Sequence, residues 1–297
     1  MPEEIISVIA GPSSPGLAEK ITKRLGAQLV QAELHVFSDG ESKIKIGRTA
    51  KNCIIVQSTY PPTDTHLMQA LMIAKKCADD GAGDICAVIP YLAYARQDRA
   101  FLEGEVVSVA LVAKLLEAAG VRHVVTVDIH SQLAMSHFAD MQNVSSIPLL
   151  AERANAMKLQ RPIAVSPDAG GADRAKEFAK YLKTDMVALK KSRDRNTGEV
   201  TIDGKLEVNI AGRDAILIDD MISSGRSIIK AAEVLRKNGA GRIYAMCAHA
   251  LLIGDASKKI KAASVQDIIA TNSVPGEYAK VDLSPAIAAA LKSRYSS

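Results

Sequence analysis

Short aliphatic and β-branched runs alternate along the chain with segments of helical periodicity. The runs occupy residues 5–10, 53–57, 85–90, 124–128, 163–167, 215–219, 243–248 and 268–271. Near-continuous hydrophobicity over such lengths is typical of parallel strands that are covered on both faces. The intervening segments place apolar residues three or four apart and stop at glycine, for example Gly26 and Gly120, where a left-handed cap is favoured. The alternation predicts βαβ units, and therefore an α/β fold with mostly parallel sheets.

Two features indicate that the chain forms two domains. Its 297 residues exceed the roughly 100–200 that one domain usually holds. Segment 87–90 (AVIP) also resembles segment 164–167 (AVSP), and each precedes a strand that ends in aspartate. We predict one domain over residues 1–147 and a second over residues 148–297, because the alternation restarts there after a polar stretch. One alternative leaves the last helix packed back on the first domain.

The composition excludes several classes of protein. Hydrophobic residues make up 48% and charged residues 24%, which is ordinary for a globular chain and excludes intrinsic disorder. A net charge of only +4, no tryptophan and 4% aromatic residues argue against a nucleic-acid partner. No stretch approaches the ~20 consecutive apolar residues of a membrane span, and the acidic start shows no signal peptide. We therefore expect no membrane association and a cytoplasmic location, with Cys53, Cys77, Cys86 and Cys247 reduced and buried.

The strongest chemical signal lies at residues 215–227 (AILIDDMISSGRS). A buried strand brings two adjacent carboxylates, Asp219 and Asp220, to its C-terminal end, and small residues lead from there into a helix. Converging N–H groups at a helix N-terminus bind phosphate, and neighbouring carboxylates can accept hydrogen bonds from vicinal hydroxyls or hold a divalent cation. The alternative, a plain turn with a capping aspartate, does not explain two successive carboxylates. The pattern therefore favours a sugar phosphate, bound by the loop residues Ser223, Ser224, Gly225, Arg226 and Ser227.

This segment resembles the phosphoribosyl-pyrophosphate-binding motif of type I phosphoribosyltransferases and their relatives. Five further motifs occur in the order expected of ribose-phosphate pyrophosphokinases: FSDGE at 37–41, YARQDR at 94–99, VDIH at 127–130, SPDAGG at 166–171 and KSR at 191–193. The chain is thereby identified as similar to that family over nearly its whole length. The resemblance implies two similar type I phosphoribosyltransferase-like domains, each with a mostly parallel sheet flanked by helices. It also implies transfer of the diphosphoryl group of Mg-ATP to the 1-hydroxyl of ribose 5-phosphate, which gives 5-phosphoribosyl 1-pyrophosphate and AMP.

Two motifs are expected to bind ATP. In the family the first motif reads the adenine, often from a neighbouring subunit, and here it comprises Phe37, Asp39, Gly40 and Glu41. An aromatic ring face and carboxylates suit a purine and its exocyclic amine, but without the resemblance these residues favour a surface turn around Gly40. Arg96 and Gln97 follow an apolar strand, where a guanidinium can make bidentate contacts to phosphate. The alternative for Arg96 is a surface ion pair.

The resemblance assigns the Mg²⁺ that accompanies ATP to His130 and Asp168, so Mg²⁺ is the expected cofactor. Imidazole is an unusual ligand for so hard a cation, and contact through water is one alternative for His130. Asp168 begins a glycine-rich turn, and its alternative role is a helix cap ahead of Ala172.

Catalysis is assigned by the resemblance to Lys191 and Arg193, and Arg193 also to ribose 5-phosphate binding. Two cations on a movable loop can close over a triphosphate and offset charge that develops only during transfer. Lys190 lies one residue from the family's Lys-x-Arg pattern, and a solvated basic loop is the alternative. Arg226 stands where relatives usually have a small residue, and both phosphate contact and exposure to solvent fit it.

Two other functions fit parts of the sequence. A base phosphoribosyltransferase would use the 219–227 loop, but such enzymes are usually single-domain and have no need of segment 37–41 or Arg96. An inactive regulatory paralogue is also compatible with the resemblance, although Lys191 and His130 are intact. If segment 37–41 completes a neighbour's site, the chain forms a homo-oligomer, a dimer or a hexamer.

Overall fold

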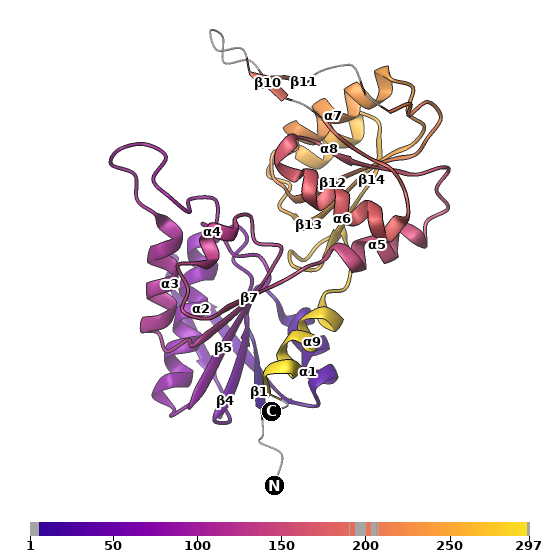
Figure 1. The fold of residues 1–297 in the computed structure, drawn as a ribbon. Helices are drawn as coiled ribbons and strands as arrows, with labels where there is room; N and C mark the ends of the chain where they lie inside the picture. The colour runs from indigo at the N-terminus through magenta and orange to yellow at the C-terminus, as the bar shows by residue number, and fades with distance from the viewer. Residues whose placement is uncertain (1–5, 190, 194–199, 203–205, 207, 296–297) are drawn as a thin grey trace. The chain divides into compact units, whose positions relative to one another are not determined.

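The computed structural model describes residues 6–189, 191–193, 200–202, 206 and 208–295 (Figure 1). The chain divides into two compact units. The first unit comprises Met1–Ser145, Ser273–Pro275 and Asp282–Ser297, and the second comprises Ser146–Asn272 and Gly276–Val281. The C-terminal helix α9 (Ser284–Tyr295) belongs to the first unit because it packs against α1 (Pro15–Leu25), where Arg24 Nε donates a hydrogen bond to Ser284 Oγ at 2.8 Å. The unit boundaries thus differ from a simple division into 1–147 and 148–297.

The first unit contains a seven-stranded sheet with the strand order β3-β2-β1-β4-β5-β6-β7. Its strands are β1 (Ile6–Ala10), β2 (Gln28–Val36), β3 (Ser42–Ile46), β4 (Asn52–Val56), β5 (Asp84–Ile89), β6 (His123–Val127) and β7 (Met141–Val144). Neighbouring strands are parallel except β2 and β3, which form an antiparallel hairpin. The further helices of this unit are α2 (Thr63–Asp79), α3 (Ser108–Ala118) and α4 (Gln132–Met135). Alternate residues of β4 and β5 pack with α2 and α3 in one hydrophobic core.

The second unit contains a six-stranded, fully parallel sheet with the order β15-β14-β13-β12-β8-β9. Its strands are β8 (Ile163–Ser166), β9 (Met186–Ala188), β12 (Ala215–Ile222), β13 (Ile243–Ala250), β14 (Val265–Thr271) and β15 (Ala279–Val281). Its helices are α5 (Ile147–Asn155), the 3-10 helix η1 (Ala169–Gly171), α6 (Ala172–Leu182), α7 (Arg226–Lys237) and α8 (Ala256–Ala262). A separate antiparallel pair joins β10 (Lys191–Arg193) to β11 (Val200–Ile202).

Residues of β12 explain why helices cover both faces of this second sheet. Ala215 and Leu217 belong to a core with α7 and α8, whereas Ile216 and Ile218 belong to a core with α5 and α6. Successive side chains of a strand point to opposite faces, so an uninterrupted apolar run is buried on both. The prediction of an α/β fold with two mostly parallel sheets flanked by helices is confirmed.

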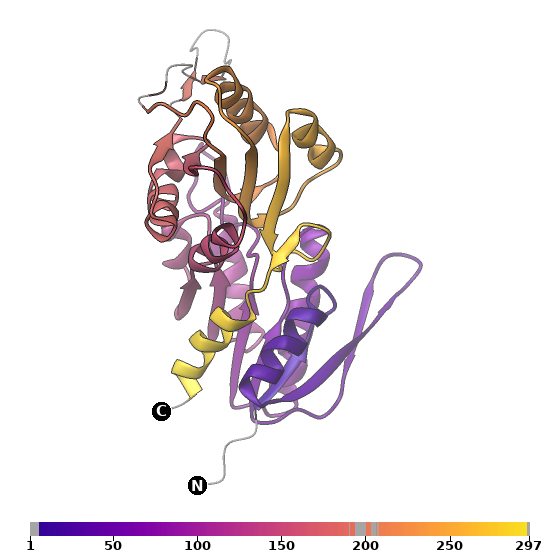
Figure 2. The same ribbon diagram turned by 90° about the vertical axis from the view of Figure 1, so that its right-hand side faces the viewer.

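The β2–β3 hairpin differs from the other strands because most of its side chains are exposed. Figure 2 shows it as an arm that projects from its sheet. Polar residues interrupt the apolar ones along both strands, so the hairpin has no continuous hydrophobic run by which the sequence would reveal it.

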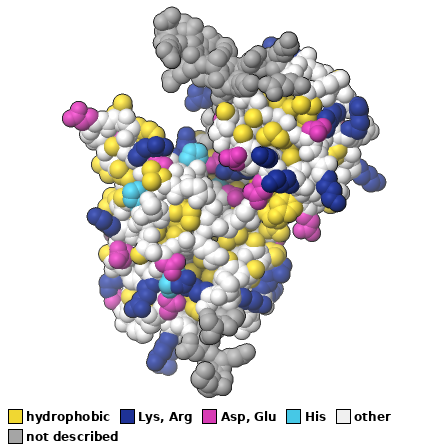
Figure 3. All heavy atoms as spheres, viewed as in Figure 1, with side chains coloured by type: hydrophobic (Ala, Val, Ile, Leu, Met, Phe, Trp, Pro, Cys, Tyr) yellow, Lys and Arg dark blue, Asp and Glu magenta, His cyan; other side chains and the backbone are white. Residues whose placement is uncertain are grey.

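The structure shows the distribution of charge on one face and the surroundings of the four cysteines. On the face shown in Figure 3, lysine and arginine side chains are scattered among acidic ones and form no single basic patch. Cys53, Cys77, Cys86 and Cys247 are buried free thiols, as predicted. Within the described part of the chain, none of the helices combines the length and the apolar character that a membrane span requires.

Candidate active site

The carboxyl ends of two adjacent strands in the first unit carry residues predicted to bind ATP and its Mg²⁺ ion. β5 leads into the turn that holds Arg96 and Gln97, and β6 leads to Asp128 and His130. The backbone of Tyr94 and that of Asp128 have positive φ angles, 65° and 39°. This conformation costs energy for residues other than glycine, and such residues cluster at functional sites. Two of the six non-glycine residues with positive φ in the described part of the chain thus lie at this edge of the sheet.

A buried aspartate joins these two segments. The Ser131 hydroxyl donates a hydrogen bond to Oδ2 of Asp98, and Nε2 of His137 lies 3.1 Å from the Asp98 carbonyl oxygen. Asp98 is 4% exposed, and its Oδ1 has no hydrogen-bond partner among the described residues, although Arg99 Nε lies 3.4 Å away. The hydrogen bond from Ser131 lowers the pKa of Asp98. Ser131 directly follows His130. The hydrogen bond between Ser131 and Asp98 therefore holds the turn that carries Arg96 and Gln97 in place relative to His130.

Buried hydroxyl groups hold together the loops that follow β1, β4 and β5. Ser58 donates hydrogen bonds from its N–H to Ser14 Oγ at 3.0 Å and from its hydroxyl to the Ser273 carbonyl at 2.7 Å. The N–H of Tyr91 donates in turn to Ser58 Oγ at 3.1 Å. Buried polar groups that are fully hydrogen-bonded rigidify a structure. The backbone at Tyr91, where the segment that carries Arg96 begins, is therefore rigidly held.

The residues predicted to read adenine lie at the tip of the β2–β3 hairpin. The Phe37 N–H donates to the Glu41 carbonyl at 2.9 Å, and the Glu41 N–H donates to Asp39 Oδ1 at 3.1 Å. Gly40 has a φ of 94°, which glycine adopts without steric cost. The Phe37 ring is 44% exposed and makes an edge contact with the His35 ring, with 4.8 Å between centroids. The tip thus presents an aromatic ring and two carboxylates to solvent.

In the second unit, β12 carries Asp219 and Asp220. The strand was predicted to end at 219 but continues to Ile222, because Met221 and Ile222 still pair with β13. The Asp220 N–H donates to Oδ1 of Asp219 at 2.9 Å, and the Met221 N–H donates to Oδ1 of Asp220 at 2.8 Å. Burial, together with the negative charge of Asp220, raises the pKa of Asp219 to about 7. Arg174 of α6 lies beside both carboxylates, 3.8 Å from Asp219 Oδ1 and 3.9 Å from Asp220 Oδ2.

The loop after β12 has the features of an anion site. Gly225 has a φ of 74°, and a Cβ atom there would lie 2.7 Å from Cδ1 of Ile260, so a side chain at this position forces its surroundings to move. Helix α7 begins at the exposed Arg226, whose Nε lies 3.4 Å from Ser224 Oγ. A cation is unfavourable at a helix N-terminus, where the helix dipole is positive, unless an anion binds beside it. The predicted loop residues Ser223–Ser227 lie between the end of β12 and the first turn of α7, where a bound anion would offset the charge of Arg226.

The two residues predicted to hold a metal have different surroundings. Asp168 Oδ1 accepts a hydrogen bond from the Gly171 N–H at 3.2 Å and caps η1, which is the structural alternative for this residue. His130 is exposed. Among the residues that the structure describes, no group of three or more His, Cys, Asp or Glu side chains could hold a metal ion. Mg²⁺ usually binds through one or two carboxylates, water and substrate phosphates. Asp168 offers one such carboxylate, and binding of Mg²⁺ by His130 and Asp168 stays a prediction.

The predicted catalytic cations lie on the separate two-stranded pair. Lys191 pairs with Ile202 and Arg193 with Val200, so the backbone here forms antiparallel strands where a movable loop was expected. The side chains of both residues, and Lys190 altogether, lie outside the described part of the chain.

Comparisons with known proteins decide the family. The N-terminal domain of ribose phosphate pyrophosphokinase is matched by residues 6–120, and the phosphoribosyl synthetase-associated domain by residues 199–291. A ribose-phosphate pyrophosphokinase from Sulfurisphaera tokodaii is 35% identical over 287 residues, which are 95% of this chain and 98% of the relative. This chain belongs to the ribose-phosphate pyrophosphokinase family.

Other members of the family give the same result. A ribose-phosphate pyrophosphokinase from Pasteurella multocida is 37% identical over 296 residues, 97% of this chain and 91% of the relative. The crystal structure of phosphoribosylpyrophosphate synthetase from Mycobacterium smegmatis aligns with a TM-score of 0.87 at 25% identity, covering 98% of this chain and 99% of that one. Likeness to pyrophosphokinases over both units argues against the single-domain base phosphoribosyltransferase that the 219–227 loop alone would allow.

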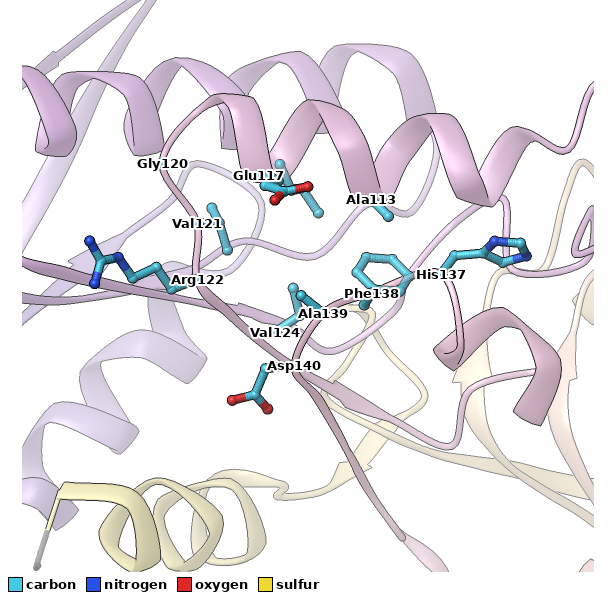
Figure 4. Close-up of a pocket in the computed structure, with 11 residues that line it drawn as sticks. Ala113, Glu117, Gly120, Val121, Arg122, Val124, His137, Phe138, Ala139 and Asp140 are labelled. Carbon is cyan, nitrogen blue, oxygen red and sulfur yellow. The ribbon is translucent and has the colours of Figure 1, made fainter.

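Two charged residues of the candidate site were not predicted. Asp98 lies inside a motif from which only Arg96 and Gln97 were predicted to bind ATP. Arg174 follows the glycine-rich turn that begins at Asp168. Nothing local in the sequence marks either residue, because Asp98 lies between Gln97 and Arg99, and Arg174 lies in a helix rich in charged residues. A groove between α3 and segment 137–140 is a separate feature (Figure 4), and no residue predicted for the site lines it.

Proposed function

We propose that this chain transfers the diphosphoryl group of ATP to the 1-hydroxyl of ribose 5-phosphate, which gives 5-phosphoribosyl 1-pyrophosphate and AMP. The observation that carries the proposal is the 35% identity to a ribose-phosphate pyrophosphokinase over 95% of this chain. The carboxylate pair and the anion loop of the second unit support it, as does the Arg96 turn of the first.

Ribose 5-phosphate binds at the carboxyl end of β12 in this proposal. Asp219 and Asp220 accept hydrogen bonds from the 2- and 3-hydroxyls of the sugar, because carboxylates are acceptors only. The 5-phosphate sits in the loop from Ser223 to Ser227, where hydroxyl and backbone N–H groups donate. Arg226 adds a positive charge to this loop, and Arg193 adds another to the sugar phosphate.

ATP binds through Arg96, Gln97 and the hairpin tip. The guanidinium of Arg96 contacts the phosphates in bidentate fashion. Gln97 is oriented by the hydrogen bond from its Nε2 to Glu105 Oε2, at 3.1 Å. The Phe37 ring packs on the adenine, while the carboxylates of Asp39 and Glu41 accept hydrogen bonds from its amine or from a ribose hydroxyl. Because the tip projects from its own sheet, we place it in the site of a neighbouring copy, which requires a homo-oligomer, a dimer or a hexamer.

His130 and Asp168 would hold the Mg²⁺ ion of the nucleotide, His130 directly or through water. When bound, the ion would offset negative charge on the triphosphate. The chain restrains Asp168 from two sides, because Gly171 donates to its carboxylate and the Ser166 hydroxyl donates to its carbonyl at 2.6 Å. The carboxylate therefore needs little reorganisation to accept a cation.

The reaction is an in-line displacement at the β-phosphorus of ATP. The 1-hydroxyl oxygen forms a bond to that phosphorus and releases its proton to solvent. The bond between the β-phosphorus and the oxygen that bridges to the α-phosphate breaks, and AMP leaves with that oxygen. Positioning and charge stabilisation dominate the catalysis of such transfers. Lys191 and Arg193 supply positive charge to the transferred group and to the departing AMP.

Incubation with ATP and ribose 5-phosphate should yield AMP and the phosphoribosyl product in equal amounts, as measured by anion-exchange chromatography. AMP formation should fall to background when ribose 5-phosphate is left out, because the sugar is the nucleophile. ADP as the main product would point to a simple kinase. Nucleotide formed from 5-phosphoribosyl 1-pyrophosphate and a free base would point to a base phosphoribosyltransferase, and either result would refute the proposal.

Asp98→Ala should raise the KM for ATP by about 5- to 30-fold, because it removes the hydrogen bond that joins the segment of Arg96 to Ser131. Ser131→Ala should have at least as large an effect, because it also removes the cap that Ser131 Oγ provides to the Leu133 N–H, and the double variant should be no worse than Ser131→Ala. The control is Glu103→Ala, which removes an exposed carboxylate from the same segment. Fully additive effects of the two substitutions would show that the Asp98–Ser131 hydrogen bond is not the source of the loss.

A further inference from the structure

Arg174 lies beside both carboxylates of the ribose site, but the motifs give it no role. One guanidinium nitrogen is 3.8 Å from Asp219 Oδ1, and the other terminal nitrogen is 3.9 Å from Asp220 Oδ2. The side chain of Arg174 is 22% exposed, and the side chains of Asp219 and Asp220 are 21% and 7% exposed. One partly buried cation therefore lies beside two adjacent, largely buried carboxyl groups.

The fold places this guanidinium through the start of α6. Ala175 and Phe178 are fully buried and anchor the helix against the sheet. Gly171 precedes the helix, and a Cβ atom there would lie 2.7 Å from Ser166 Oγ and 4.0 Å from a terminal nitrogen of Arg174. A larger residue at 171 would displace the turn next to the guanidinium. Helix α6 also contacts β12 directly, so the arginine and the carboxylates belong to one packed arrangement.

The chemistry of this trio suits an orienting role. Adjacent carboxylates repel each other, and their repulsion grows as they are buried. A planar guanidinium offers several donors in a fixed fork and can face two carboxylates at once, which a lysine ammonium cannot reproduce. Each carboxylate is also held by a backbone N–H on its Oδ1 atom. These backbone hydrogen bonds restrain the two carboxylates from within strand β12, and Arg174 restrains them from helix α6.

We propose that Arg174 is a positioning residue for ribose recognition, which holds Asp219 and Asp220 side by side so that they accept hydrogen bonds from the 2- and 3-hydroxyls. This inference rests on the proposed function, because it assigns the specificity of the same site. It makes Arg174 a determinant of the preference for ribose 5-phosphate over 2-deoxyribose 5-phosphate. The deoxy sugar lacks one of the two hydroxyls, so it gains little from a correctly oriented carboxylate pair.

The test compares Arg174→Met with the wild-type enzyme, using both sugar phosphates. The KM for ribose 5-phosphate should rise by about 10- to 100-fold, the range for hydrogen bonds to charged groups, while the KM for ATP stays near the wild-type value. The ratio of kcat/KM for ribose 5-phosphate to that for 2-deoxyribose 5-phosphate should fall by about tenfold or more. Arg174→Lys should restore only part of the ratio, because one ammonium cannot face both carboxylates as the fork does.

Lys176→Met is the matched control, since it removes an exposed cation from the same helix and should leave the ratio unchanged. A drop in thermal stability with an unchanged sugar ratio would overturn the proposal and make Arg174 a purely structural residue. Equal increases in both KM values would do the same. If Arg174→Met does not fold, the sugar ratio of Arg174→Lys decides the question. Absence of ribose 5-phosphate-dependent AMP formation in the wild-type enzyme would instead refute the proposed function itself.

Discussion

Lys191→Ala should lower kcat by about 100- to 1,000-fold, the range seen when one group that stabilises transition-state charge is removed. The KM values for ATP and ribose 5-phosphate should stay within a few-fold of wild type. The reason is that the proposal assigns Lys191 to charge that develops during transfer and not to binding of the ground state. Initial rates of AMP formation over a range of each substrate measure both constants.

Lys190→Ala is the matched control for Lys191→Ala, because it removes a lysine one residue earlier. Only Lys191 fits the family's Lys-x-Arg pattern, so the Lys190 variant should keep most of its turnover. Loss of turnover in Lys190→Ala, with Lys191→Ala active, would show that Lys190 is the catalytic cation in place of Lys191. Full turnover in both variants would contradict the catalytic role of this segment.

Asp219→Asn should lower kcat/KM for ribose 5-phosphate by about 100-fold while raising the thermal stability of the ligand-free protein at pH 8. An asparagine side chain cannot replace a carboxylate that accepts two or more hydrogen bonds, and loss of a charged acceptor costs about 1.5–3 kcal/mol. The gain in stability has a separate cause, which is the raised pKa of Asp219. Steady-state kinetics and thermal melting at several pH values measure the two effects independently.

The sign of the stability effect follows from proton binding. In the folded protein, burial and the charge of Asp220 raise the pKa of Asp219 to about 7 from its ordinary value of 3.8. Between these two values the folded state binds more protons than the unfolded state, so this group's contribution to stability falls as pH rises through the window. Above pH 7 the penalty is complete. Asparagine carries no such penalty, so the melting temperature of Asp219→Asn should exceed that of wild type at pH 8 and approach it near pH 4.

Asp214→Asn should change the stability in the opposite direction. Asp214 directly precedes strand β12, and its pKa is lowered where that of Asp219 is raised. Burial alone would raise the pKa of Asp214, but hydrogen bonds from Arg242 and from the Gln160 N–H hold it below its ordinary value. This carboxylate therefore stabilises the folded protein above its unfolded pKa, and the stabilisation is lost as pH falls. Asp214→Asn should lower the melting temperature at pH 8. If both variants shift the melting temperature in the same direction, the raised pKa of Asp219 is not the cause of its effect.

The continuous apolar runs were enough to predict the two parallel sheets, because burial on both faces leaves a strong pattern. The run at 215–219 is a clear example, since its alternate residues enter two different cores. The same logic failed for the β2–β3 hairpin, whose exposed strands need no apolar run. It left the place of α9 open between the two domains, because that place depends on contacts with α1, at the other end of the chain.

The candidate site was predictable to the extent that its residues lie in local motifs. Asp219, Gly225 and Arg226 could be predicted from their spacing along one segment. In the structure they lie near the end of strand β12 and the start of helix α7. Asp98 and Arg174 could not be found in this way. Their roles depend on contacts with Ser131 and with the carboxylate pair, which lie far away in the sequence and are brought close only by packing.

ATP labelled with radioactive phosphorus at the β-position tests the central claim most directly. Incubated with the enzyme and ribose 5-phosphate, the label should leave the nucleotide entirely and move to 5-phosphoribosyl 1-pyrophosphate, with one unlabelled AMP formed for each labelled product. This result requires the bond between the α- and β-phosphates to break while the β,γ bond stays intact. Labelled ADP, or label released as free pyrophosphate with ribose 5-phosphate unchanged, would contradict diphosphoryl transfer to the sugar.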